Sequence, residues 1–542
     1  MTQNSNGGHE LQRGIKGWQV TFIGLGGVIG SCYFLGIGVC VRTMGPAVLL
    51  GFALVSIVIY AVMVAYAELL VNVPRTGSFI SYTKEFLGPQ WSIGMGWAFW
   101  CNWVAFVPAE CIALASTVKY MTGSDSLVLY AGVAIGALAV VTIINIAAVS
   151  LFSKIEGVLG ITKVSVIILF IIVGLGIWLG LWGNHGGFVG ASVNFSNMGS
   201  LTDALFPKGS LIVFTQMTLI LVTCEGTELI GLAAAEAQNP EESVPKACKS
   251  VIWRVLGLYL VPIVLILLVY PWGNAQDEVP IFADICNSYG MPILGFIMSA
   301  AVFVAAFSCS NSGFYGSVRG MYGLATEGLA PKFLKKVTPN GNPRNCVWLT
   351  MGCMWVIMIL GLVSQLTGAL ETLYASLLSL AGFTGTMCWI GICLSQYMMR
   401  RKLKQRGYDP KTCLKARVSD KLSWLPLVAA LIQIVVLVML VIEDQLVFSI
   451  AAACTIVPMV IRYINVKRGK AEDSVALSSH EKSFDELFPP LRDAAVEKQH
   501  HHMTVGELME EIKHSEIVEE IRHSELVEEL KHMEKQPEVG LD

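Results

Sequence analysis

The sequence predicts an all-α membrane protein with twelve transmembrane helices, on three observations. Hydrophobic residues make up 54% of the 542 positions and charged residues only 14%, whereas about a quarter of the residues of a soluble protein are charged. Many apolar runs exceed the roughly 20 residues that a helix needs to cross a lipid bilayer. Glycines interrupt the first and the sixth of these runs, which predicts broken helices 1 and 6.

The predicted spans define the organisation of the chain. We expect them over residues 18–42, 46–72, 91–120, 126–149, 156–183, 208–237, 248–272, 291–325, 346–366, 371–399, 424–443 and 445–464. The resulting segments are a cytoplasmic N-terminal segment (1–17), a first inverted repeat with helices 1–5 (18–183), a second inverted repeat with helices 6–10 (184–399), a basic cytoplasmic loop (400–423), two extra helices (424–466) and a cytoplasmic tail (467–542).

Lysine and arginine are concentrated in alternate connections between the spans. One side of the membrane receives most of them, including the basic loop, whereas the other side has little beyond Arg42, Lys119 and Lys208. The positive-inside rule then predicts a multi-pass protein of the cell membrane with both termini in the cytoplasm. No small-residue cleavage site follows the first apolar run, so we interpret this run as a retained span rather than a signal peptide.

The first span contains four glycines in the seven positions from Gly24 to Gly30. A membrane helix must satisfy its own backbone hydrogen bonds, because lipid provides no partners. One interpretation is close packing of two helices over small residues. The other is an unwound midpoint, whose freed N–H and C=O groups line a binding cavity.

The sixth span is interrupted at residues 225–228, where Gly226 and Thr227 lie between the carboxyl groups of Glu225 and Glu228. Ionisable residues at membrane depth face a cavity or a partner and are usually functional. Because the two interrupted spans are five spans apart, they predict a transporter built from two inverted five-helix repeats. We detect no residue-level similarity between the halves, so the repeat is inferred from position.

Four short stretches carry a family resemblance. They are residues 26–31 in helix 1, residues 74–79 with Gly88-Pro89 after helix 2, residues 225–231 with Glu236 and Asn239-Pro240 in helix 6, and Asn311-Ser312-Gly313 with Arg319 and residues 327–331 in helix 8 and its exit. The chain resembles the amino acid–polyamine–organocation (APC) superfamily, and within it bacterial amino acid permeases related to the lysine permease. The resemblance implies the inverted-repeat fold and a secondary transporter that imports amino acids by alternating access, as a proton-coupled symporter.

The resemblance also implies a small-molecule site between helices 1 and 6, and the physics of broken helices agrees. Half-helix N-termini expose N–H groups that suit a carboxylate, and half-helix C-termini expose carbonyls that suit an ammonium group. We assign the substrate carboxylate to the N–H groups of Gly30, Ser31 and Cys32. We assign the substrate ammonium group to carbonyls near Val28, Ile29, Cys224 and Gly226.

The sequence departs from the family pattern at two positions of this site. Cys32 replaces a glycine that relatives commonly have, and Glu225 replaces a glutamine. A carboxylate at position 225 can pair with a cationic side chain or a free amine, which favours cationic amino acids. The alternative is a neutral carboxyl group, or one that is paired within the protein, because burial disfavours a charge.

Lys163 places an amine inside the fifth span. Similar permeases have a lysine here, at the position of a sodium site in sodium-coupled relatives. The resemblance implies contacts with helix 1 carbonyls near Gly26 and with Asn311 and Ser312 in helix 8, and we expect Glu228 to tune this proton-coupling site. A buried amine gives up its proton readily, so Lys163 can alternate between its charged and neutral forms. The alternative is a fixed ion pair with a glutamate.

Three further carboxyl groups lie at membrane depth. We interpret Glu68 and Glu110 as structural, although Glu110 can also face the cavity. Glu236 lies near the cytoplasmic end of helix 6, where it is expected to pair with lysine or arginine.

Other classes of protein find little support. No Gly-x-x-x-x-Gly-Lys motif occurs, which argues against ATP-driven transport. No spacing suggests a nucleophile–base pair or a metal site, so we expect neither an enzyme nor a cofactor, and we expect no nucleic-acid partner. The fourteen cysteines include no C-x-x-C pair, and we expect them to be reduced packing residues.

Two alternatives to a symporter stay open: an exchanger of amino acids or amines, and an amino acid receptor that signals through its tail. The tail contains a nine-residue repeat from Gly506 to His532. Nine residues turn a helix by half a rotation, so the apolar patches alternate between faces, and we expect a solvated helix or a disordered tail. Its histidines could instead bind metal weakly or sense pH. The sequence identifies neither the amino acid, nor the stoichiometry, nor the oligomeric state.

Overall fold

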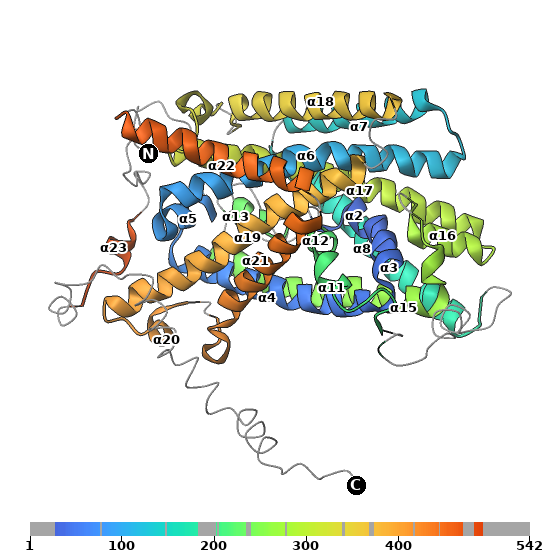
Figure 1. The fold of residues 1–542 in the computed structure, drawn as a ribbon, viewed down its shortest axis with the longest axis horizontal. Helices are drawn as coiled ribbons and strands as arrows, with labels where there is room; N and C mark the ends of the chain where they lie inside the picture. Colours follow the sequence, from blue (N-terminus) through green and yellow to red (C-terminus); the bar gives the residue numbers. More distant parts are fainter. Residues whose placement is uncertain are drawn as a thin grey trace, which may run out of the picture.

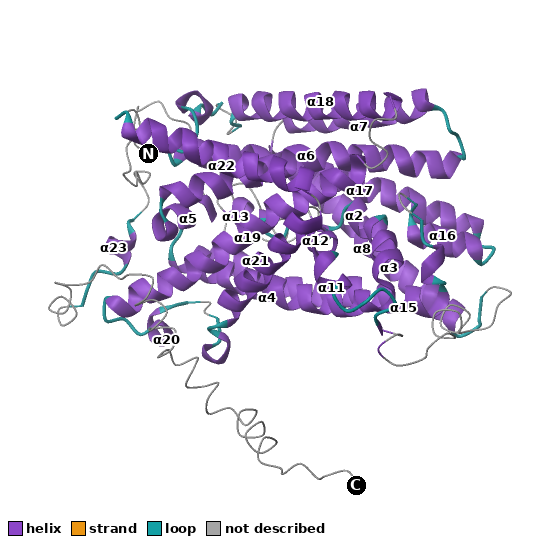
Figure 2. Ribbon diagram, viewed as in Figure 1, coloured by secondary structure: helices purple, strands orange, loops and turns teal. Residues whose placement is uncertain are grey.

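The protein folds into a bundle of helices. The computed structural model describes residues 28–75, 79–146, 149–182, 202, 205–234, 240–276, 279–338, 342–367, 373–415, 418–443, 445–469 and 482–491. Within these residues there are helices and loops but no strand (Figures 1 and 2), which confirms an all-helical fold. Eight helical stretches of the described chain are long and apolar enough to cross a membrane, and Gly257–Val269 and Leu425–Met439 are shorter apolar helices.

The first half of the chain contains the helices α2 (Ser31–Phe34), α3 (Gly36–Met44), α4 (Val48–Asn72), α5 (Phe79–Leu87), α6 (Pro89–Thr122), α7 (Leu127–Ile146) and α8 (Val149–Trp178). All but α5 fall on predicted spans, and α5 is a short helix in the connection between α4 and α6. Helix α8 begins at Val149 rather than at residue 156. Ser150, Ser153 and Lys154 lower the hydropathy there, although the backbone is already helical.

The second half contains α11 (Ile212–Thr215), α12 (Met217–Val222), α13 (Leu229–Ala234), α14 (Pro240–Val255), the π-helix η2 (Leu256–Leu260), α15 (Val261–Val269), α16 (Ile281–Ser288), α17 (Pro292–Thr326), α18 (Arg344–Thr367), α19 (Leu373–Gln405), α20 (Pro410–Cys413), α21 (Leu425–Glu443), α22 (Gln445–Lys467) and α23 (Phe484–Leu487). Helix α19 continues through Gln405, past the expected end at residue 399. The beginning of the expected basic loop is therefore the last helical turn of α19, with Lys402 and Lys404 in it.

The centre of the bundle is built on α6 and α17, which pack directly against each other. Glycines allow the close approach. A carbon added at Gly313 of α17 would lie 2.4 Å from the ring of Trp103 of α6, and one added at Gly96 of α6 would lie 2.5 Å from Leu324 of α17. In the most apolar window of α6, 94% of the residues are buried. Polar side chains of α6 therefore face the protein interior rather than lipid.

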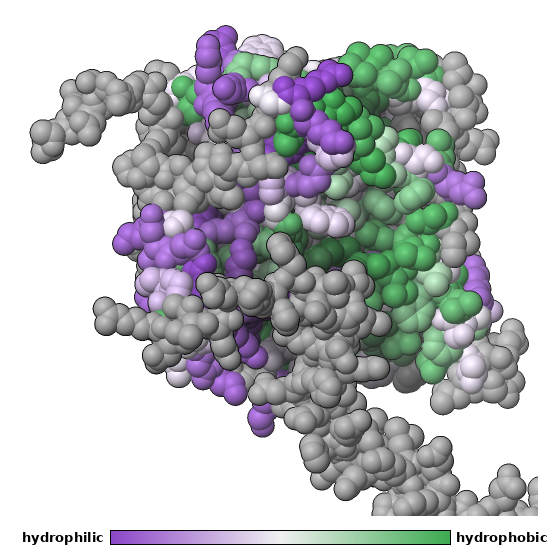
Figure 3. Space-filling view, turned by 60° about the vertical axis from the view of Figure 1, so that its left-hand side comes forward, coloured by the Kyte–Doolittle hydropathy of each residue, from purple (hydrophilic) through white to green (hydrophobic). Residues whose placement is uncertain are grey.

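The outer helices show the opposite pattern. Large apolar side chains are exposed on α7, α18 and α21, among them Val128 (84%), Ile143 (67%), Leu360 (64%) and Leu431 (59%). Figure 3 shows apolar side chains gathered over one broad part of the surface and hydrophilic ones over another. Soluble proteins rarely expose apolar patches of this size. Together with the long apolar helices, this surface defines a multi-pass membrane protein.

The cysteines pack as predicted. All fourteen are free, and most are buried among helices. None forms a disulfide, so the fold depends on helix packing rather than on covalent cross-links.

One part of the expected solvated tail is packed against the bundle. In residues 482–491, which include α23, the side chain of Phe484 is only 3% exposed. The prediction of a wholly solvated tail is therefore wrong for this segment, because two phenylalanines interrupt its polar sequence. The nine-residue repeats lie outside the described residues.

Glu68 has the structural role that we expected. Its carboxylate is fully buried at the end of α4 and accepts hydrogen bonds from Arg400 Nε at 2.7 Å and Nη2 at 2.6 Å. Gln396 Nε2 at 2.8 Å and the backbone N–H of Val418 at 2.7 Å also donate hydrogen bonds to this carboxylate. This buried ion pair holds α19 against α4.

Removing Glu68 should therefore destabilise the bundle. Glu68→Ala leaves Arg400 buried without its partner, which costs about 3–5 kcal/mol in comparable pairs. We expect a clearly lower apparent melting temperature of the detergent-solubilised protein. The control is Glu242→Ala, because Glu242 pairs with Lys246 where both side chains are more than 70% exposed. Equal melting temperatures for the two variants would contradict the structural role.

Candidate functional site

The second broken helix is directly visible. Helix α12 ends at Val222 and α13 begins at Leu229, and turns connect them through residues 223–228. Gly226 has a φ of 100°, a conformation that residues with a side chain rarely adopt. The glycine between the two carboxyl groups is therefore required by the break that the sequence predicted.

The first break is described from Val28 onward. Gly30 has an extended backbone (φ −117°, ψ −161°), and α2 begins at Ser31. A carbon added at Gly30 would lie 2.6 Å from Cys309 Sγ and 2.7 Å from Glu110 Oε1. Close packing and a broken helix, offered as alternatives from the sequence, thus occur together at Gly30. Gly26, with the other glycines before Val28, lies outside the described residues.

Glu110 occupies the N-terminus of the half-helix that follows the first break. The backbone N–H of Ser31 donates to both of its carboxyl oxygens, at 2.9 and 3.1 Å, and Cys32 Sγ lies 3.7 Å from Oε1. The Glu110 side chain comes from α6 and is fully buried. Glu110, for which the sequence favours a structural role and leaves a cavity-facing one open, lies at the N–H group assigned to the substrate carboxylate.

Tyr259 links the two breaks. It lies in the π-helix η2, and its hydroxyl is 2.9 Å from the carbonyl of Thr223 and 3.3 Å from that of Val28. Its ring centroid lies 4.4 Å from that of Tyr33, whose own hydroxyl donates to the carbonyl of Leu258. Tyr259 is not predictable as a site residue from the sequence, because a tyrosine within an apolar span carries no local sign of what its hydroxyl contacts.

Glu225 is buried against α19. One carboxyl oxygen, Oε2, accepts from Asn102 Nδ2 of α6 at 3.2 Å. The other, Oε1, has no hydrogen-bond partner within the described residues. A carbon added at Gly385 of α19 would lie 2.4 Å from the carboxyl carbon of Glu225. Only a glycine at position 385 leaves room for this carboxyl group.

Glu228 stabilises the break itself. Its two oxygens lie 3.0 and 3.2 Å from the N–H of Gly226, and Oε2 accepts from Trp389 Nε1 of α19 at 3.0 Å. The carboxyl group thus satisfies a backbone donor that the interrupted helix cannot. Cys224 is fully buried in the same turn, and the N–H of Leu229 donates to the carbonyl of Gly226 at 3.1 Å.

Lys163 comes from α8 and is 1% exposed. Glu110 is buried as well, and opposite charges attract more strongly where water is excluded. Helix α17 packs against both α8 and α2. On α17, Asn311 Oδ1 accepts from Asn145 Nδ2 at 2.9 Å, and the buried Oγ of Ser312 has no hydrogen-bond partner within the described residues.

The predicted residues thus form two groups, one at each break. Ser31, Cys32 and Glu110 lie at the first break, whereas Glu225, Gly226 and Glu228 form the second. Tyr259 connects the groups. Among the described residues, histidine, cysteine, aspartate and glutamate form no cluster that could hold a metal ion. The arrangement suits a ligand that carries both charges.

A polytopic helical protein with two broken helices around buried charges has the architecture of a carrier. The family model described as "Amino acid permease" matches residues 19–475. The chain therefore belongs to the amino acid permease family, in the APC superfamily.

Three bacterial relatives show the breadth of the similarity. The lysine-specific permease LysP of Lactococcus lactis subsp. cremoris is 30% identical over 429 residues, which cover 76% of this chain and 80% of LysP. The amino-acid permease RocE of Bacillus subtilis is 31% identical over 465 residues, 86% of this chain and 96% of RocE. A putative histidine permease of B. subtilis is 32% identical over 76% of this chain and 84% of its own length. Family membership supports amino acid transport across a membrane.

The contact between Gly385 and Glu225 can be tested directly. Gly385→Ala should displace the Glu225 carboxyl group and weaken amino acid binding about tenfold, because overpacking costs about 1–3 kcal/mol and about 1.4 kcal/mol is a factor of ten. Scintillation proximity binding with labelled amino acids measures this. The control is Gly352→Ala in α18, where an added carbon meets nothing within 4 Å. Unchanged binding in Gly385→Ala would separate Glu225 from the substrate site.

Proposed function

We propose that this permease imports amino acids by proton-coupled symport and favours cationic substrates. The observation that carries the proposal is the set of buried carboxyl groups at the two breaks. Glu110, Glu225 and Glu228 are each at most 2% exposed, and the cationic side chain of Lys163 is 1% exposed. A buried excess of acidic groups favours a partner that brings positive charge. The lysine-specific names of two relatives agree with this preference.

The substrate lies between the two breaks in this proposal. Its carboxylate binds the N–H groups of Gly30, Ser31 and Cys32, and its ammonium group binds the carbonyls near Val28, Ile29, Cys224 and Gly226. Support comes from the extended backbone at Gly30 and the turns at 223–228. Since Glu110 already accepts from Ser31, it has to leave that N–H when a substrate carboxylate arrives.

Displacement of Glu110 provides a route to coupling. Glu110 and Lys163 are both buried, so in this proposal moving Glu110 changes the charge environment of the amine. Lys163 then carries the coupled proton, and Glu228 tunes the site. The carbonyls near Gly26 and the polar groups of Asn311 and Ser312 receive the amine. The alternative is a fixed ion pair between Lys163 and a glutamate, which the Lys163→Gln variant below tests.

The finer architecture belongs to the same proposal. Twelve spans form two inverted five-helix repeats with broken helices 1 and 6, followed by two extra helices. Both termini lie in the cytoplasm, and the protein resides in the cell membrane. The two breaks and the basic end of α19 support this layout.

The decisive experiment is uptake into proteoliposomes. A panel of labelled amino acids is offered with and without an imposed proton gradient, each competed against the others. We expect lysine or arginine to accumulate above the external concentration only with the gradient. Accumulation that instead depends on preloaded amino acid, with no response to the gradient, would identify an exchanger.

Glu225→Gln tests the preference for cations. At an effective dielectric near 20, opposite charges about 4 Å apart attract by roughly 4 kcal/mol before desolvation, and a quarter of that is about fivefold in affinity. We therefore expect cationic ligands to lose about fivefold more affinity than neutral ones. Competition binding measures both classes, with Glu242→Gln at an exposed position as the control. An equal loss for both classes would make Glu225 structural or proton-linked.

Lys163→Gln tests the coupling. The amide cannot carry a proton between the two sides of the membrane, so gradient-driven accumulation should be lost while counterflow exchange persists. The readout is the ratio of internal to external labelled substrate under a proton gradient alone. If Lys163→Gln still concentrates the substrate, another group carries the proton.

A further inference from the structure

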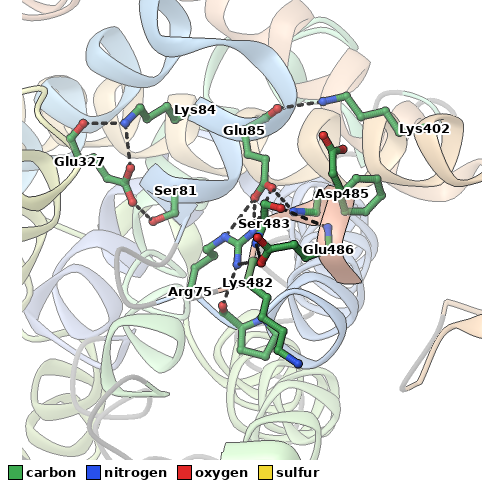
Figure 4. Close-up of polar contacts among 12 residues, drawn as sticks. Arg75, Ser81, Lys84, Glu85, Glu327, Lys402, Lys482, Ser483, Asp485 and Glu486 are labelled. Carbon is green, nitrogen blue, oxygen red and sulfur yellow. Dashed lines mark hydrogen bonds and ion pairs between the residues drawn. The ribbon is translucent and has the colours of Figure 1, made fainter. Parts of the chain in front are cut away.

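A short segment of the tail is fastened to the bundle at a defined surface. Residues 482–491, which we call the tail strap, contact Arg75 and α5 (Figure 4) and also the end of α19. The strap comes after α22, the last long helix of the described chain, and its partners lie far away in the sequence. Neither the family resemblance nor the site at the breaks accounts for these contacts.

The first attachment is to α5. Arg75, at the end of α4, forms a bidentate ion pair with Glu85 of α5, with N–O distances of 2.8 to 3.0 Å. The remaining nitrogen of Arg75 donates to the carbonyl of Lys482 at 2.7 Å. Glu85 Oε1 also accepts from the backbone N–H of Phe484 at 3.0 Å. The same ion pair therefore holds both the loop and the beginning of the strap, as Figure 4 shows.

The second attachment is to the end of α19. Arg406 donates to the carbonyls of Phe484 and Phe488, at 3.2 and 2.8 Å, and pairs with Asp485. A cation at the C-terminal carbonyls of a helix is favourable. Tyr408 donates to the carbonyl of Pro489 at 2.7 Å, and the N–H of Leu491 donates back to the carbonyl of Arg406 at 3.1 Å.

An aromatic anchor lies between the two attachments. The ring of Phe484 is 5.3 Å from that of Phe86 in α5, and the Arg406 guanidinium lies 4.6 Å from its centroid. Ser483 and Glu486 form a reciprocal capping box that fixes the first turn of α23. Such boxes satisfy two otherwise free backbone donors. The strap is therefore folded for docking rather than resting loosely on the surface.

The two docking elements pack against each other, and each has further partners of its own. Lys84 of α5 pairs with Glu327, which follows α17, at 3.1 Å, and Ser81 donates to the same carboxylate at 2.5 Å (Figure 4). Helix α5 is thus fixed to the group that includes α6 and α17. Helix α19 also packs against α6, and it contacts the second break through Gly385 and Trp389. The strap spans the junction at which α5 meets the end of α19.

We propose that the tail strap is an autoinhibitory brake, which restrains the separation of α5 from the end of α19 during transport. Within the described residues, α5 and α19 also pack directly against each other, Lys402 Nζ donates to the carbonyl of Glu85 at 2.9 Å, and the same amine lies 5.1 Å from the centroid of the Phe86 ring. The strap adds two groups of hydrogen bonds and a buried ring to these contacts. When the strap is released, α5 and the end of α19 move apart more easily, and the transport rate increases. The effect on the transport rate, the kinetic part of the proposal, rests on the proposed transport function. The effect on the separation of α5 and α19, the mechanical part, does not.

Hydrogen–deuterium exchange on the full chain tests the mechanical part without any substrate. Phe484→Asp puts a charge at the buried anchor, and Asp485→Arg reverses an ion pair at a side chain that is 77% exposed, so the second variant leaves the interior intact. The matched control is Leu491→Ala, whose side chain is 45% exposed and whose backbone contact persists. We expect exchange in residues 79–87 and 400–406 to rise about threefold in both strap variants and not in the control. Faster exchange confined to residues 482–491 would overturn the proposal.

Initial uptake of labelled lysine in the same proteins tests the brake. Both strap variants should transport about twofold faster or more at saturating lysine, with the control at the rate of the unmodified protein. A rate equal to or below that of the unmodified protein, in a variant with faster exchange, would refute the brake. If the unmodified protein takes up no amino acid, the proposed function fails while the exchange result still decides the strap.

Discussion

Backbone hydrogen bonding in a medium without water is the constraint on which the rest of the structure depends. Lipid offers no partner to a free N–H or C=O group, so each break in a membrane helix has to be satisfied from within the protein. Glu110 accepts from Ser31 at the first break, Glu228 accepts from Gly226 at the second, and Tyr259 reaches a carbonyl at each. The ionisable residues at the site are therefore also what keeps the breaks stable.

This double role explains why the site is crowded. A carboxyl group that satisfies a backbone donor occupies the place where a substrate carboxylate binds in the proposed mechanism. Binding then replaces Glu110 by the substrate carboxylate as the acceptor for the Ser31 N–H, so the substrate does not enter a site with a free backbone donor. Such an exchange makes little net change in hydrogen bonding, since a satisfied donor remains satisfied. Selectivity must then come from groups with spare capacity, of which Glu225 Oε1 is an example within the described residues.

The structural features that could be predicted from the sequence are those that depend on a pattern of neighbouring residues. Glycines in an apolar run mark the break at Gly30, and a glycine between two carboxyl groups marks the one at Gly226, so both were found. Glu110, Tyr259 and the fit of Gly385 against Glu225 depend on contacts between helices distant in the chain, and no spacing encodes them. The docked strap was missed for the same reason. Its two phenylalanines are ordinary in a polar tail until their partners on α5 and α19 are known.

Tyr259 contacts both breaks through a single hydroxyl group. Its hydroxyl carries one hydrogen but lies within bonding distance of two carbonyls, at 2.9 Å from Thr223 and 3.3 Å from Val28. A phenol donates one hydrogen bond at a time, so the hydroxyl can satisfy only one break at any instant. The hydroxyl therefore has two alternative orientations, one toward each break. Because the two differ only by rotation of one O–H bond, a change at either carbonyl alters the hydrogen bond that is available to the other.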